Sequence, residues 1–159
     1  LTEDTLVEYL DRDYDFVIDA IDSVISKAQM IYYCKRNKIP IVCTGGAGGQ
    51  TDPAQVAIKD LSRTWNDPLA AKVRSLLRRE YGFSKSPGRS FSVPCVFSTE
   101  QLVYPRQDGS VCQQKTGGLP NLRMDCESGF GAATVVTATF GFVAVSRVIK
   151  KIVEKAARA

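Results

Sequence analysis

The sequence has 159 residues, of which 44% are hydrophobic and 24% charged, enough for one domain with an apolar core. This composition excludes disordered and collagen-like chains. Histidine is absent, which excludes Ser-His-Asp and Cys-His catalytic pairs, histidine metal sites and a histidine general base. The net charge of +4 hides an asymmetry, because residues 1–34 carry eight acidic and two basic side chains and the remainder nine acidic and nineteen basic ones.

The first residue and the cysteines bear on the cellular context. The chain opens on leucine with no signal peptide, so we expect residues 1–159 to be a single domain from a longer protein. The five cysteines are an odd number at irregular spacings, and no two form a C-x-x-C pair. This usage favours a cytoplasmic location over secretion and argues against a cysteine-based zinc site.

The first elements in chain order predict a β-α-β unit. Residues 14–20 form a short β-rich run that ends on acidic and small side chains, as a buried strand would. Apolar residues then recur at helical spacing over 24–36, and Asp22 or Ser23 can cap that helix. Residues 39–43 form a second apolar strand, which we expect to run parallel to the first. The turn after the first strand therefore lies at the carboxyl edge of the sheet, where α/β proteins bind ligands.

The middle of the chain contains a glycine-rich loop, a helix and further strands. Residues 44–50 include four glycines but match neither the P-loop nor the G-x-G-x-x-G frame. Residues 55–59 follow as a strand, and an Asp-Pro pair begins a helix over 67–80. After a basic loop rich in glycine, serine and proline, residues 91–104 alternate as strand material.

Residues 128–146 contain no charged side chain, a stretch long enough to be mistaken for a transmembrane segment. Glycine, threonine and serine dilute its apolar character, and the helical pattern continues into a charged segment beyond Arg147. We therefore interpret 128–146 as a buried core helix and not a membrane span.

Five motifs occur together and in order. They are D-A-I-D-S at 19–23, T-G-G-A-G-G-Q at 44–50, D-P-L-A-A-K at 67–72, C-V-F-S-T-E at 95–100 and M-D-C-E-S-G-F-G-A-A at 124–133. As a set they resemble the tRNA threonylcarbamoyladenosine dehydratases, a family within the ubiquitin-activating-enzyme-like ThiF/MoeB/HesA superfamily. The resemblance covers nearly the whole chain, and the set is specific although no single motif is.

The resemblance implies an α/β fold, a partial Rossmann-like parallel sheet with flanking helices. The chain would be the C-terminal part of an ATP-dependent adenylating enzyme, without the N-terminal nucleotide-loop half, so the fragment alone would be inactive. The implied reaction is dehydration of threonylcarbamoyladenosine next to the tRNA anticodon. Its carboxylate attacks the α-phosphorus of ATP, pyrophosphate leaves, and an internal nucleophile of the same base attacks the acyl-adenylate.

The resemblance assigns the carboxyl-edge turn to the nucleotide. Asp22 matches an aspartate that is implied to hold Mg²⁺ and the triphosphate, which suits a hard oxygen ligand; a helix N-cap is the simpler alternative. Asp19 belongs to the same cofactor-binding motif but could serve only to orient the turn. Ser23, the third residue assigned to the nucleotide, replaces an asparagine that many relatives have.

Cys126 aligns with a cysteine that is proposed, in relatives, to attack acyl-adenylates or to carry sulfur. Its acidic neighbours raise a thiol pKa, whereas Arg123 and a following helix N-terminus lower it. Since cyclisation needs no acyl-enzyme, Cys126 is either catalytic, persulfide-accepting or a structural bystander. Cys34, Cys43 and Cys95 lie in apolar segments and are expected to be core residues.

A basic stretch at 72–89 holds six cations against one anion and has interleaved aromatic residues, as in surfaces that grip nucleic-acid phosphates. A solvated helix face is the alternative. With tRNA as the implied substrate, we assign tRNA binding to its cations, which are Lys72, Arg74, Arg78, Arg79, Lys85 and Arg89.

Cofactors and partners follow from the resemblance. ATP and Mg²⁺ are implied, the glycine-rich loop could supply carbonyls to a monovalent cation, and the relatives' zinc site is not carried over because its cysteine pairs are absent. The enzyme would act as a homodimer on tRNA without a membrane partner. The alternative function is a non-catalytic or sulfur-relay module that docks a cysteine desulfurase system.

Overall fold

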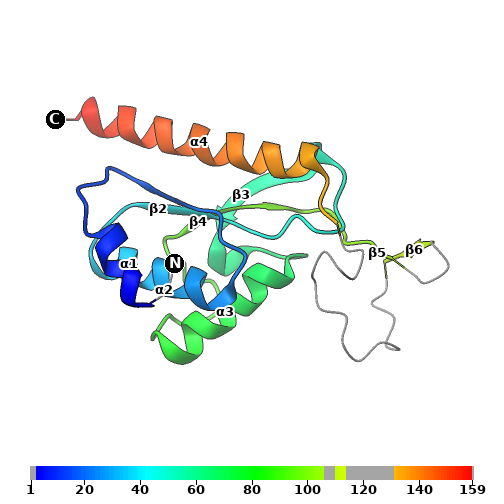
Figure 1. Cartoon of the computed structure of the whole chain (residues 1–159), viewed down its shortest axis with the longest axis horizontal. Helices are drawn as coiled ribbons and strands as arrows, with labels where there is room; N and C mark the ends of the chain where they lie inside the picture. The colour runs from blue at the N-terminus through cyan, green and yellow to red at the C-terminus, as the bar shows by residue number, and fades with distance from the viewer. Residues whose placement is uncertain (1–2, 106–109, 114–130, 159) are drawn as a thin grey trace.

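The computed structural model describes residues 3–105, 110–113 and 131–158 (Figure 1). Its centre is a four-stranded sheet in the order β1-β2-β4-β3. Strands β1, β2 and β4 are parallel, and β3 is antiparallel to β4. Their bounds are Val17–Asp19 for β1, Ile41–Thr44 for β2, Val56–Asp60 for β3 and Pro94–Ser98 for β4. A small hairpin of β5 (Tyr104–Pro105) and β6 (Val111–Cys112) lies away from this sheet (Figure 1).

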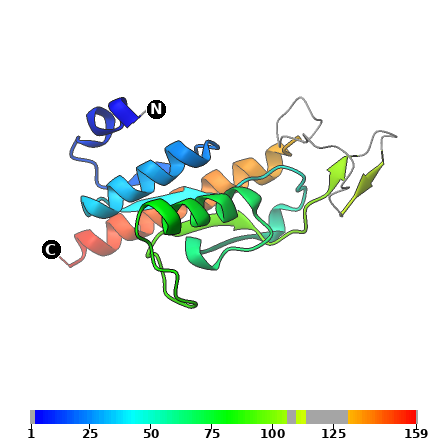
Figure 2. The same cartoon turned by 90° about the horizontal axis from the view of Figure 1, so that it is seen from below.

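Helices cover both faces of the sheet (Figures 1 and 2). Helices α2 (Val24–Arg36) and α3 (Pro68–Glu80) pack together on one face, with α1 (Glu3–Leu10) against α2. Helix α4 (Thr134–Ala156) covers the opposite face. The apolar core is accordingly divided in two, a larger cluster under α1, α2 and α3 and a smaller one under α4. The expected α/β fold with flanking helices is confirmed.

Local signals placed two helices correctly. Ser23 caps α2 by accepting a hydrogen bond from the backbone N–H of Ser26, and α2 ends in the basic pair Lys35 and Arg36, which the helix dipole favours. Asp67 caps α3, and Pro68 occupies its first turn. The predicted parallel pairing of the first two strands is confirmed, whereas the antiparallel direction of β3 was not predicted from the sequence. No α-helix connects β2 to β3, so the chain turns back at the carboxyl edge and β3 runs in the opposite direction.

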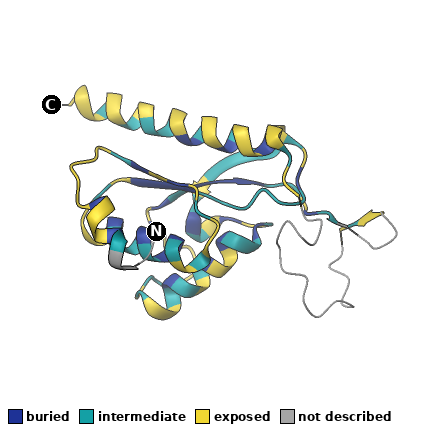
Figure 3. Ribbon diagram, in the orientation of Figure 1, coloured by how far each residue is buried: buried dark blue, intermediate teal, exposed yellow. Residues whose placement is uncertain are grey.

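Helix α4 is less buried than its uncharged sequence indicated. It begins at Thr134, and only the stripe Val136, Phe140 and Ala144 is buried, against Val42 and Val96 of the sheet. The other side is open to solvent, with Phe142 76% exposed (Figure 3). The interpretation as a buried helix is corrected for residues 134–146, because the sheet can cover only one stripe of a helix; residues 128–130 lie outside the described residues. Among the described residues, no helix is long and apolar enough to cross a membrane.

Asp60 organises the opposite, amino edge of the sheet. It ends β3 opposite Pro94 of β4, and its carboxylate accepts hydrogen bonds from the backbone N–H groups of Phe91 and Val93 at 2.9 and 3.1 Å and from the Ser90 hydroxyl at 2.7 Å. Burial acts to raise the pKa of Asp60, but hydrogen bonds from Ser62, Ser90 and Phe91 outweigh it and lower the pKa to about 2. The ionised carboxylate therefore holds the segment that leads into β4.

We predict that Asp60→Asn lowers the free energy of unfolding by about 1–2 kcal/mol at pH 7, because the amide cannot accept all of these hydrogen bonds. The folded pKa lies below the ordinary value of 3.8, so this stabilisation is present above pH 4 and lost as the pH falls from about 4 to about 2. In urea unfolding, the difference in the free energy of unfolding between parent and variant should be smaller at pH 3 than at pH 7. Asp11→Asn, on an exposed side chain, is the control, and an equal gap at both pH values would contradict the prediction.

Candidate functional site

A pocket of about 410 Å³ lies at the carboxyl edge of β1 and β2; we call it the carboxyl-edge pocket. Both strands end there, so the turn after β1 and the glycine-rich loop after β2 face each other across it. The start of α4 and one residue of α3 complete the wall. The lining residues are Ile18, Ala20, Ile21, Asp22, Thr44, Gly45, Gly46, Ala47, Leu69, Ala132, Thr137, Phe140 and Gly141. Sequence reasoning found the turn and the loop but missed the contribution of α4, whose lining residues are 90 or more positions away from both in the chain.

Asp22 is the one acidic side chain in this lining, and it is exposed. Ser23, not Asp22, caps α2, so the helix-cap alternative for Asp22 is wrong. Within the described ranges, no hydrogen bond or ion pair engages the Asp22 carboxylate. A lone carboxylate at a pocket wall fits Mg²⁺ bound with a triphosphate, because that ion takes one or two protein carboxylates and completes its shell with water and phosphate.

Asp19 is 1% exposed and faces the protein interior. Its Oδ2 lies 2.8 Å from the Nζ of Lys27, and its Oδ1 accepts a 3.0 Å hydrogen bond from the backbone N–H of Ile21. Burial raises the pKa of Asp19, while the charge and hydrogen bond of Lys27 act to lower it. The carboxylate is thus fully occupied in shaping the turn that presents Asp22 to the carboxyl-edge pocket.

Lys27 was not singled out from the sequence. It is 1% exposed on the inner side of α2, and its Nζ also lies 3.4 Å from the Asp19 carbonyl oxygen. A lysine in a helix normally indicates a solvated position, since this residue type is almost never fully buried unless paired. The sequence did contain an indication of this pairing, because Arg12 and Lys27 are the two basic residues among residues 1–34, which carry eight acidic side chains.

Asp67 holds the opposite wall of the pocket. Its Oδ1 accepts from the backbone N–H of Ala70 at 2.9 Å as the α3 cap, and its Oδ2 accepts from the N–H of Gly46 at 3.1 Å. A Cβ on Gly45 would lie 1.7 Å from Oδ2, so this position accommodates glycine alone without displacing Asp67. Burial raises the pKa of Asp67, and these backbone donors oppose the rise. One buried carboxylate therefore ties the glycine-rich loop to α3.

The loop ends at Gln50, whose side chain is fully buried. Neither its Oε1 nor its Nε2 has a hydrogen-bond partner in the described part of the chain. Buried side-chain amides are normally hydrogen-bonded, so Gln50 is positioned for a partner that the described part of the chain does not supply.

A second, basic pocket of about 320 Å³ lies along α3 and includes Arg74, Arg78, Arg79 and Lys85; we call it the α3 basic pocket. Lys72 and Arg89, also predicted for tRNA binding, do not line it. Four cations thus converge, and the charge of Arg78 adds to burial in lowering the pKa of Arg74. Such like-charge crowding favours an anionic ligand.

The cations of this pocket differ in accessibility. Arg74 is half-buried and donates to the Thr64 hydroxyl, and Arg78 donates to the Ser84 carbonyl oxygen at 3.3 Å. Arg79 is exposed and pairs with Glu80 at 2.6 Å, while Lys85 is exposed. Arg74 and Arg78 therefore stabilise the local fold through these hydrogen bonds and also contribute positive charge to the pocket.

The cysteines divide between the core and the part that is not described. Cys34, Cys43 and Cys95 are buried free thiols, as expected, and burial raises the pKa of Cys34 to about 11. Cys126 and Arg123 lie outside the described residues, so the role of Cys126 stays a prediction. Cys112, in β6 of the hairpin, is partly exposed.

We predict that Lys27→Met destabilises the protein by about 3–5 kcal/mol, because it leaves the buried Asp19 carboxylate without its cation. The double variant Asp19→Asn/Lys27→Met should recover a large part of that loss in urea unfolding, since no uncompensated charge remains. Lys35→Met, on an exposed lysine of the same helix, should change stability by less than about 0.5 kcal/mol. If the destabilisations caused by Asp19→Asn and by Lys27→Met simply add in the double variant, the ion pair between these two residues does not stabilise the protein.

Comparisons with known proteins place the chain among curated relatives. It is 57% identical over 158 residues to the tRNA threonylcarbamoyladenosine dehydratase of Escherichia coli K12, covering 99% of this chain and 59% of the relative. The dehydratase of Haemophilus influenzae is 57% identical over 148 residues, covering 93% of this chain and 54% of that protein. The chain therefore spans less than two thirds of the length of these relatives. No family model matches it.

A solved structure agrees with the fold. The crystal structure of the E. coli tRNA N6-threonylcarbamoyladenosine dehydratase in complex with ATP superposes with a TM-score of 0.81 at 51% identity, covering 99% of this chain and 56% of that one. The resemblance that the five motifs indicated is thus confirmed: in sequence and in fold, the chain is similar to somewhat more than half of a tRNA threonylcarbamoyladenosine dehydratase.

Proposed function

We propose that this chain supplies one wall of the adenylation site of an ATP-dependent enzyme that dehydrates threonylcarbamoyladenosine in tRNA. The observation that carries the proposal is the carboxyl-edge pocket, where Asp22 stands on a turn held by the buried Asp19–Lys27 pair. The similarity to a dehydratase whose structure contains ATP supports the nucleotide as ligand. The remaining part of such an enzyme, by the resemblance its N-terminal nucleotide-loop half, would supply the other wall.

Adenylation of the substrate carboxylate replaces a poor leaving group, a carboxylate oxygen, by a good one, AMP. The substrate carboxylate attacks the α-phosphorus of ATP and pyrophosphate departs, after which an internal nucleophile of the modified base attacks the acyl carbon and AMP departs. Asp22 would hold Mg²⁺ with the triphosphate, and that ion would supply the positive charge that stabilises a departing pyrophosphate. The turn and the glycine-rich loop contribute by fixing both walls before the nucleotide binds, through the Lys27 and Asp67 contacts.

Three finer features belong to the same proposal. The orphaned Oε1 of Gln50 fits a monovalent cation that the glycine-rich loop would help to bind. A cytoplasmic homodimer is the expected working form, and light scattering at two concentrations tests the dimer. Docking of a cysteine desulfurase system, the alternative function, depends on Cys126 and is not favoured by any contact among the described residues.

We predict that, in the full-length protein, Asp22→Asn reduces Mg²⁺-dependent exchange of pyrophosphate into ATP at least 100-fold, because the amide keeps the shape but loses the charge that holds the ion. Exchange should be stimulated by modified tRNA in the parent protein. Residues 1–159 alone should neither bind ATP tightly nor show exchange.

Asp13→Asn, on an exposed aspartate of the same acidic segment, is the matched control and should leave exchange unchanged. Both variants should retain the parent melting temperature. Near-normal exchange by Asp22→Asn would remove Asp22 from the metal-binding role, and no tRNA-stimulated exchange by the parent would refute the proposed function.

The α3 basic pocket is the proposed tRNA contact, and its exposed cations allow a clean test. We predict that Arg79→Gln/Lys85→Gln raises the KM for tRNA and lowers the salt slope of tRNA affinity by up to about 2, since each phosphate contact contributes about 0.7–0.9. The KM for ATP should not change. Arg74 and Arg78 are left intact because they hold Thr64 and Ser84.

Arg36→Gln/Lys38→Gln removes the same charge from exposed positions at the end of α2 and is the matched control. If the contact is specific, the α3 double variant should change the KM for tRNA and the salt slope more than the α2 double variant does. Equal effects of the two double variants would show that the α3 cations lie on a solvated helix face and make no specific contact with tRNA.

A further inference from the structure

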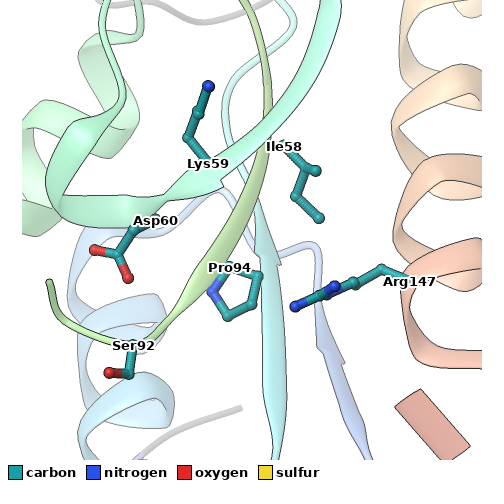
Figure 4. A pocket seen from close by; sticks show the side chains of 6 residues that line it. All are labelled: Ile58, Lys59, Asp60, Ser92, Pro94 and Arg147. Carbon is teal, nitrogen blue, oxygen red and sulfur yellow. The ribbon is translucent and has the colours of Figure 1, made fainter. Parts of the chain in front are cut away.

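A third pocket lies at the edge of the sheet opposite to the carboxyl-edge pocket, between α4 and the strands β3 and β4 (Figure 4). It has a volume of about 480 Å³, and we call it the Arg147 pocket. Its lining residues are Ile58, Lys59, Asp60, Ser92, Pro94 and Arg147. The register pair of Asp60 with Pro94 places the pocket where β3 ends and β4 begins. It is therefore separate from the proposed adenylation site.

Arg147 is the distinctive feature of this pocket. Figure 4 shows its guanidinium extending from α4 toward the Pro94 ring. The Nε atom is buried and has no hydrogen-bond partner, and none of the four ion pairs found in the described ranges includes Arg147. A buried donor that lacks a partner destabilises the protein, so this guanidinium is arranged to receive an acceptor that the described chain does not provide.

The nearby carboxylate does not fill that role. Asp60 already accepts from Ser90, Phe91 and Val93, and in Figure 4 its carboxylate points away from Arg147. The Lys59 side chain also points away from Arg147 in Figure 4, so the Arg147 guanidinium is the cationic group that faces this space among the lining residues. A guanidinium with free N–H groups pairs best with a phosphate or a carboxylate, which it can contact through two parallel hydrogen bonds.

The surroundings favour phosphate on a nucleic acid. One segment of chain, residues 85–92, runs from Lys85 in the α3 basic pocket to Ser92 in the Arg147 pocket, and it carries the exposed Arg89. The two cationic pockets therefore lie at the two ends of one short loop. A polyanion with evenly spaced phosphates can contact both pockets, whereas a single small anion can fill one at most.

We propose that Arg147 forms a second phosphate subsite for the RNA backbone, so that the tRNA contact extends from α3 along residues 85–92 to α4. This inference rests on the proposed function, because it takes tRNA as the substrate. It adds a surface that neither the basic stretch at 72–89 nor the five motifs of the sequence include.

The test compares Arg147→Gln with Lys150→Gln, an exposed lysine one turn along α4 that loses the same charge. In the full-length protein, tRNA affinity is measured at three salt concentrations. Arg147→Gln should weaken binding about 3- to 10-fold and lower the salt slope by about 0.7–0.9, whereas Lys150→Gln should have a clearly smaller effect. Equal effects, or no effect of Arg147→Gln, would overturn the subsite.

Two further measurements separate the explanations. The melting temperature of Arg147→Gln should be at or above that of the parent; a lower value with unchanged tRNA affinity would make Arg147 a structural residue and overturn the proposal. The NMR signal of the Arg147 Nε–H group should shift on addition of tRNA and not with millimolar inorganic phosphate; the reverse would assign the pocket to a free anion. Pyrophosphate exchange by the parent tests the proposed function independently, so failure of either idea is distinguishable.

Discussion

The ion pair between Lys27 and Asp19 is the contact on which the rest of the site depends. Asp19 is the last residue of β1 and Lys27 lies on the inner side of α2, so their 2.8 Å contact fixes how the helix leaves the strand. Two charges are removed from water at this point, which is unfavourable unless each has its partner and further hydrogen bonds. The Asp19 carboxylate also receives the N–H of Ile21, so the requirement for pairing shapes the turn as well.

A second buried carboxylate extends this constraint across the pocket. The charge of Lys27 also acts on Asp67, which caps α3 and receives the N–H of Gly46. Because both walls are held by side chains beneath them, the pocket is shaped before any ligand arrives, which is the arrangement expected for electrostatic stabilisation of a reacting nucleotide. Asp22 can stay free for a ligand because Ser23 performs the capping of α2.

The direction of the strands separates two kinds of chemistry. Parallel strands place their ends at one edge, where the acidic turn and the glycine-rich loop meet, whereas the helices that return to the other edge end there in basic residues. Arg147, far along α4, also lies at that other edge.

The sequence by itself determined what is encoded within a few neighbouring residues. Capping and periodicity located α2 and α3, and the apolar runs at 14–20 and 39–43 indicated parallel strands. The motif at 19–23 singled out Asp22, which lines the carboxyl-edge pocket. Only the tertiary structure decided that β3 is antiparallel, that α4 is half exposed, and that Lys27 is buried. These features depend on which residues distant in the chain meet across the sheet, and the free energy of such contacts is not contained in any local pattern.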